Sequence, residues 1–199
     1  MTEARAKART RPGESRFAQG FALFAECLLT GVWIAVAALP LVTYPAAFAA
    51  GARHLGRRMA HERGGWREFV ADFRAAVRRG WLVGVAGWAA LAVVWVDVRA
   101  VRDGLPGGPL VGAVGVLALI GAVVAGLRAA ADWRPGASWR SLLAGAGRRT
   151  VLDPAGSFLL VGGLAVVVCS AWFSAPLAVA VLGAVAAAAV AVEERHRGR

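Results

Sequence analysis

Glu26 is the only charged residue between Phe17 and Ala52, in an otherwise uncharged and mostly apolar stretch. An unpaired charge inside a lipid bilayer costs about 3 kcal/mol, so a carboxylate at this place needs a cationic partner. If the chain reverses near residue 43, residues close to position 60 lie at the depth of Glu26. We therefore predict an intramembrane ion pair between Glu26 and either Arg53 or Arg57. The alternative is a hydrated Glu26 near the inner membrane interface.

Other residue types that often carry chemistry are few. Cys27 and Cys169 lie in apolar stretches without a CxxC spacing, which disfavours a zinc site and a disulfide framework. His54, His61 and His196 have no carboxylate at metal-binding spacing, and the first two are expected to be solvated on a basic helix face. Phosphate-loop and GxSxG motifs are absent. The sequence therefore predicts no catalytic residues, no metal site and no cofactor.

The remaining aspartates that could form a carboxylate pair lie in short polar segments. Asp132 and Asp153 flank one such segment, and Asp97 and Asp103 flank another. Without a buried environment to shift their pKa values, we expect them to be solvated loop charges. Asp153 is also expected to cap a helix that begins at Pro154.

The composition indicates an integral membrane protein. The 199 residues are 58% hydrophobic and 18% charged, whereas a soluble domain is roughly 45–50% apolar and about 25% charged. The net charge of +11 could suggest nucleic-acid binding. However, the charge is confined to segments that flank apolar stretches, so anionic lipids are the expected partners and nucleic acid is not.

The apolar stretches divide into membrane spans at prolines. Residues 154–192 carry no charge, and as one helix they would be about 58 Å long, nearly twice the thickness of the hydrocarbon core. Because proline removes a backbone donor and favours a helix start, the break is expected at Pro176. In the first stretch, Pro40 and Pro45 bracket Thr43 and predict a helix-hairpin break there. The spans predicted from these breaks are 20–41, 45–60, 81–97, 108–127, 155–173 and 176–192.

The distribution of basic residues favours six spans over five. With six spans and both termini in the cytoplasm, all of the 23 lysines and arginines except Arg99 and Arg102 lie inside. A five-span arrangement, in which the segment after Pro45 does not cross, leaves more of them outside. We therefore predict an all-α bundle of six spans in the inner membrane. The single transmembrane domain covers 17–192, between basic cytoplasmic tails at 1–16 and 193–199.

Two cytoplasmic segments are predicted to be amphipathic helices in the inner interface, 66–79 and 138–149. In the first, aromatic and apolar residues recur every three or four positions and arginines take the other side. Such helices place arginines against anionic headgroups. The expected lipid-headgroup contacts are Arg58, Arg67, Arg74, Arg78, Arg79, Arg140, Arg148 and Arg149.

Several of these motifs resemble the YesL-like family of small bacterial membrane proteins. They are Leu39-Pro40-Leu41-Val42-Thr43, Trp66-Arg67-Glu68-Phe69 with Phe73-Arg74, and the later Trp139-Arg140. The sequence departs from the family pattern at Tyr44-Pro45, where an aliphatic residue and glycine are usual. The resemblance implies a multi-span inner-membrane protein of unassigned biochemistry. Because family members are often encoded near carbohydrate uptake systems, it also implies an accessory role in sugar transport by association.

Two functions follow as expectations. The first is a non-enzymatic accessory or regulatory component of a carbohydrate transport system, with transporter subunits as partners. The second is a small transporter or channel that uses a cytoplasm-facing polar crevice around Glu26, Arg53 and Arg57. A polar cavity that reaches the middle of the membrane would favour the second, and an interior packed with alanine would favour the first.

Overall fold

The computed structural model describes residues 12–60, 62, 64–104 and 107–198, and in these ranges it contains helices and no strand. The predicted tail 1–16 and His61 therefore lie wholly or largely outside the described residues. The seven helices are α1 (Pro12–Ala37), α2 (Tyr44–Met59), α3 (Trp66–Arg102), α4 (Gly108–Ala131), α5 (Trp139–Leu152), α6 (Pro154–Phe173) and α7 (Ala175–Arg197).

Five helices are long and apolar enough to cross a membrane: α1 from Gly20, α3, α4, α6 and α7. Their large apolar side chains are widely exposed, as at Trp172, which is 89% accessible. Such exposure suits a surface that contacts lipid tails, because a soluble protein rarely leaves large apolar patches in water. These helices therefore indicate a membrane protein.

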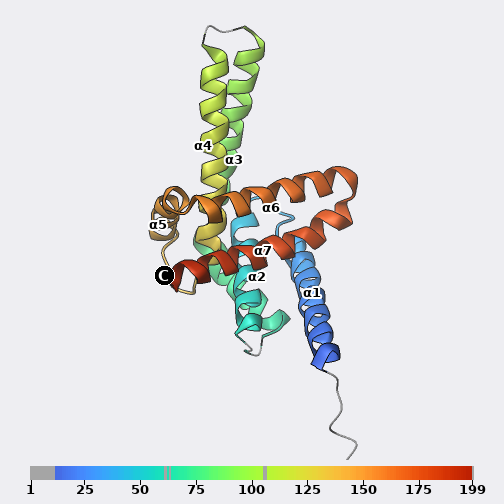
Figure 1. The fold of residues 1–199 in the computed structure, drawn as a ribbon. Coiled ribbons are helices and arrows are strands. Elements are labelled where there is room, and N and C mark those ends of the chain that lie inside the picture. The colour runs from blue at the N-terminus through green and yellow to red at the C-terminus, as the bar shows by residue number, and fades with distance from the viewer. Residues whose placement is uncertain (1–11, 61, 63, 105–106, 199) are drawn as a thin grey trace, which may run out of the picture.

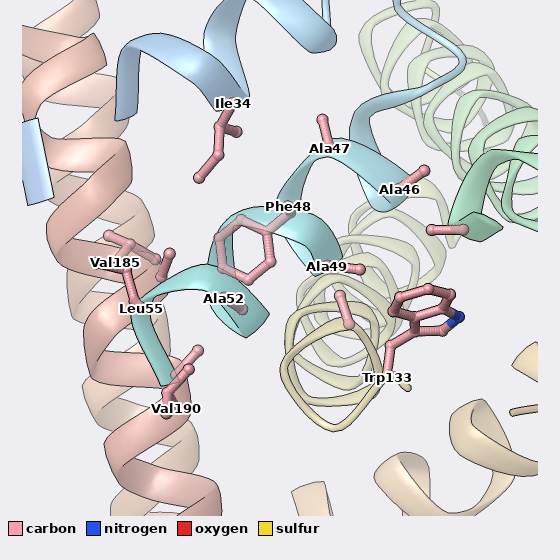
Figure 2. Close-up of a cluster of buried hydrophobic side chains, with 14 of the residues drawn as sticks. Ile34, Ala46, Ala47, Phe48, Ala49, Ala52, Leu55, Trp133, Val185 and Val190 are labelled. Atoms are coloured by element: carbon pink, nitrogen blue, oxygen red, sulfur yellow. The ribbon is translucent and has the colours of Figure 1, made fainter. Parts of the chain in front are cut away.

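The predicted second span, 45–60, is a helix but not one of these five. α2 has only 16 residues, whereas a span needs about 20. It packs against α1, α3, α4 and α7 in the centre of the protein. Figure 2 shows it between Ile34 of α1, Val185 and Val190 of α7, and Trp133. Five of the six predicted spans thus fall on helices long and apolar enough to cross a membrane, whereas the predicted second span is a short, largely buried helix.

Small side chains allow α2 to be enclosed in this way. Ala46, Ala47, Ala49, Ala50 and Ala52 have no accessible surface. Alanine loses little side-chain entropy in a helix and lets neighbouring backbones approach closely. The N-terminal half of α2 is consequently the densest part of the core.

The break between α1 and α2 lies where the prolines predicted it. Pro45 occupies the first turn of α2, and the Thr43 hydroxyl donates a hydrogen bond of 2.7 Å to the Ala37 carbonyl across the turn. The chain between them includes Pro40. The second break is also confirmed, because α6 ends at Phe173 and α7 begins with Pro176 in its first turn.

The predicted interfacial helix 66–79 and the predicted span 81–97 form one continuous helix, α3. Gly80 does not interrupt it, since a single glycine costs a helix only about 1 kcal/mol. The Trp139 ring packs on this position and would lie 3.2 Å from an added Cβ atom. At 1.5 Å per residue α3 is about 55 Å long and exceeds a hydrocarbon core of about 30 Å. The second predicted amphipathic segment, 138–149, does form a separate helix, because α5 covers Trp139–Leu152.

The helices do not form one parallel bundle. α3 and α4 make a long antiparallel hairpin, α6 and α7 make a second hairpin that crosses it, and α1 extends in another direction (Figure 1). The crossing of α1 and α7 depends on glycine. An added Cβ on Gly31 would collide with the Val179 carbonyl, and one on Gly183 would collide with the Cys27 carbonyl. Such close backbone contact fixes the α6–α7 hairpin to α1.

Candidate functional site

Glu26 contacts one arginine and one histidine of α2, but neither is a predicted partner. Its Oε1 atom lies 2.9 Å from His54 Nε2 and 2.8 Å from Arg58 Nε. Residues 54 and 58 are four apart and form one stripe of α2 that faces α1. The predicted partners, Arg53 and Arg57, form the adjacent stripe, about 100° away around the helix. The prediction of an ion pair between α1 and α2 is thus correct, whereas both named arginines are wrong.

Arg53 and Arg57 instead pair with Asp72 of α3. Arg53 Nε lies 3.3 Å from Asp72 Oδ2, and Arg57 Nη2 donates to the same oxygen. Sequence analysis did not single out Asp72 within the predicted amphipathic helix 66–79. The signal was nonetheless present. Asp72 follows the buried Phe69 by three residues and precedes the buried Ala76 by four, so it lies on the core face and needs a cation.

His54 is completely buried, contrary to the expectation of a solvated side chain. Its ring contacts Trp33 edge-on, with centroids 5.0 Å apart, and Trp33 in turn contacts Trp66 and Phe69. Its Nδ1 atom makes no hydrogen bond to any described residue. We call Glu26, Arg53, His54, Arg57, Arg58 and Asp72 the α2 cluster.

A second set of ion pairs joins α4, α5, α7 and the start of α6. Arg128, with no accessible surface, lies 3.1 Å from Asp153 Oδ2 and 3.4 Å from Glu193 Oε1. Arg149 pairs with Glu193 and lies 3.2 Å from Asp132 Oδ2. We call these five residues the α4 cluster. Each buried charge in it has an opposite charge, as burial requires.

The α4 cluster corrects three expectations. Asp132 and Asp153 were expected to be solvated, and Arg149 was expected to contact lipid headgroups, but all three pair within the protein. Glu193 was assigned to a basic tail, yet α7 continues to Arg197 and buries it. Arg128 and Glu193 were missed because each follows an apolar run, which marks a helix boundary but not the direction of the side chain.

Asp153 fulfils the capping role predicted from its position before Pro154. A carboxylate oxygen accepts a 3.2 Å hydrogen bond from the Gly156 N–H group in the first turn of α6. This bond, together with the Arg128 guanidinium, holds the pKa of Asp153 below its usual range. Asp153 therefore stays charged and connects the helix start to the α4 cluster.

Most of the arginines expected to contact lipid headgroups remain available. The exposed ones on α3 are Arg67, Arg74, Arg78 and Arg79, and those on α5 are Arg140 and Arg148. Arg58 is 41% exposed at its side chain but pairs with Glu26. The two clusters hold no group of three His, Cys, Asp or Glu residues suited to a metal ion, within the described ranges. In both clusters, side chains of opposite charge on different elements neutralise each other.

The chain matches no family model, no curated protein and no solved structure. The resemblance to the YesL-like family therefore stays a prediction that depends on the quoted motifs alone.

Proposed function

We propose that the protein is a non-enzymatic, multi-span membrane component that acts by binding another membrane protein, as an accessory or regulatory subunit of a transport system. The observation that carries this proposal is the packing of α2. Its segment Ala46–Ala52 is enclosed by apolar side chains from four other helices, including Ile34, Val124 and Val185. A densely packed apolar centre suits a scaffold rather than a conduit.

The surface of the molecule supports the same proposal. Apolar side chains cover α3, α4 and α6 on the outside, while the buried charges of Asp72, Arg128 and Glu193 are paired between elements. A stable framework with a broad apolar exterior can contact a second membrane protein within the bilayer. The assignment of that partner to carbohydrate transport draws its support only from the motif resemblance.

Orientation and lipid contact are part of the proposal. Arg99 and Arg102 lie at one end of the α3–α4 hairpin, with Asp103 beside them, whereas the exposed arginines on the first half of α3 and on α5 lie toward its other end. The positive-inside rule then places the second group in the cytoplasm, facing anionic headgroups of an inner membrane.

Purification from native membranes tests this function. The full chain is extracted in a mild detergent, and co-purifying proteins are quantified by mass spectrometry. We expect a transporter subunit in near-equal amount to the tagged chain. A matched control is an unrelated multi-span protein with the same tag. Isolation of the chain as a free monomer, with no transporter subunit above the control, would contradict the proposal.

A small transporter or channel is the second candidate, and one observation favours it. In the α2 cluster, His54 Nδ1 and Arg57 Nε are buried without a hydrogen bond to any described residue. Unpaired buried polar atoms are uncommon and can serve a passing polar solute. Uptake of radiolabelled sugars and ions into proteoliposomes tests this alternative. Transport by the purified chain, lost in Glu26→Gln, would favour it over the accessory role.

A further inference from the structure

A cavity of about 470 Å³ lies where the start of α5 packs against α3. Its walls are Ala75, Arg78 and Arg79 of α3, Trp133 and Ala137 in the connection between α4 and α5, and Trp139 at the start of α5. This volume falls within the range of about 300–1,000 Å³ that is typical of small-molecule sites. The cavity is separate from the α2 cluster and from the α4 cluster, none of whose residues line it.

The indole wall of the cavity is held in place. Trp139 Nε1 donates a hydrogen bond of 3.3 Å to the Ala76 carbonyl, and the Trp133 and Trp139 rings are stacked with centroids 6.5 Å apart. Both side chains are almost fully buried. Gly136, with φ of +88°, supplies the left-handed turn between them. The wall is therefore formed before any ligand binds.

The opposite wall is positively charged and unneutralised. Arg78 and Arg79 are exposed, and neither makes an ion pair with a residue in the described ranges. No acidic side chain lines the cavity. A guanidinium group carries five N–H donors in a planar fork that matches the oxygens of a phosphate. This arrangement complements an anion with a phosphate group.

The position of the cavity along α3 indicates where that phosphate comes from. Arg78 and Arg79 come just before Gly80 and Trp81, where the long apolar part of α3 begins. Basic and tryptophan side chains at such a boundary lie at the level of the lipid headgroups. We propose that this cavity is a discrete site for the headgroup of an anionic phospholipid, with its phosphate bound by Arg78 and Arg79. The proposal rests on the proposed cytoplasmic, lipid-facing orientation of this surface.

Lipid retention tests the site. The full chain is reconstituted in phosphatidylcholine nanodiscs that contain a small fraction of phosphatidylglycerol, and the lipid that stays bound after extraction is counted by native mass spectrometry. Because each charge-assisted hydrogen bond contributes about 1.5–3 kcal/mol, Arg78→Gln with Arg79→Gln should lower phosphatidylglycerol retention about tenfold or more. The matched control, Arg140→Gln with Arg148→Gln, removes the same charge from exposed positions outside the cavity and should leave retention nearly unchanged.

A second variant keeps the test independent of charge. Ala75→Phe places a ring in the cavity without changing any charge, and it should also lower phosphatidylglycerol retention. Gel filtration and thermal unfolding of each variant verify that it is folded. Retention that stays unchanged in both Ala75→Phe and the Arg78/Arg79 double variant would overturn the site.

The remaining outcomes distinguish a discrete headgroup site from diffuse binding of lipid to the basic surface around it. Equal loss in the cavity variant and in the Arg140/Arg148 control would overturn the discrete site but leave a diffuse basic surface. Equal retention of phosphatidylglycerol and phosphatidylcholine by the wild type would overturn both. Displacement of the lipid by millimolar inorganic phosphate would assign the cavity to free phosphate and overturn its assignment to a lipid.

Discussion

Arg128 and Glu193 are 65 residues apart in the chain, yet their side chains meet in the interior with 0% and 1% of their surface accessible. Arg128 ends the apolar part of α4, and Glu193 lies near the end of α7. Two buried charges of opposite sign neutralise each other only while both helices keep their positions. The pair therefore makes the stability of the membrane domain depend on the packing of α4 against α7.

Glu193→Gln should destabilise the fold by about 3 kcal/mol, because the buried guanidinium of Arg128 then lacks the negative charge that faces its Nη1 atom. Unfolding in mixed micelles, followed by circular dichroism as the fraction of SDS is raised, measures the change. The exposed neighbour Glu194 provides the control, and Glu194→Gln should change the unfolding free energy by less than about 0.5 kcal/mol. An equal effect of the two substitutions would show that the buried pair adds no stability.

Charge exchange should identify the partner of Glu26. Glu26→Arg and Arg58→Glu alone each place like charges together and should reduce the yield of monodisperse protein in gel filtration. The double variant restores an opposite pair and should recover much of that yield. Glu26→Arg with Arg57→Glu serves as the control and should not recover, because Arg57 pairs with Asp72. Recovery in the control alone would show that the originally predicted partner is the real one.

Gly84→Ala should destabilise the contact between α3 and the turn that precedes α2. An added Cβ would collide with the Val42 carbonyl, a backbone group that cannot rotate away. Overpacking of this kind costs about 1–3 kcal/mol. Gly162→Ala on α6 is the matched control, since no atom lies within 4 Å of its added Cβ, and it should be neutral or slightly stabilising. The free energy of unfolding in SDS is measured for both variants. Equal values would contradict the close contact between Gly84 and the Val42 carbonyl.

Cysteine labelling should determine the orientation of α3. Cys27 and Cys169 are free thiols and are first replaced by alanine, and single cysteines then replace Arg67 and Asp103, near opposite ends of the helix. In intact cells, a membrane-impermeant maleimide should label Asp103→Cys, whereas Arg67→Cys should react only after lysis. Labelling of Arg67→Cys in intact cells would show that α3 has the opposite orientation and would contradict the proposed cytoplasmic lipid site.

Helix positions could be predicted from the sequence because local signals determine them. The prolines at 45 and 176 lie in the first turns of α2 and α7, as expected from their missing N–H group. Gly80 is the exception. Local sequence offers a place for a break, but the ring of Trp139, which packs on Gly80, covers that position in the folded protein.

Side-chain partners could not be predicted in the same way, because they depend on how neighbouring helices are rotated. On α2, the stripe of His54 and Arg58 lies about 100° from the stripe of Arg53 and Arg57, so the rotation of α2 about its axis decides which stripe meets Glu26. The turn at 38–43 leads into α2, and in it Leu41 has a φ of +59° and its carbonyl accepts a hydrogen bond from the indole of Trp88. Neither feature has a clear sequence signature.

The unbroken course of α3 has a mechanical consequence. A helix without a proline or a glycine break along its length behaves as a stiff rod, and α3 contains no proline and bends at none of its glycines enough to end the helix. Between its ends α3 is held at several places: Asp72 pairs with α2, Gly80 packs on Trp139, and Trp88 bonds the turn at Leu41. A displacement of either end of this rod is therefore transmitted along the whole helix, from Trp66 to Arg102, and to the helices that pack against it.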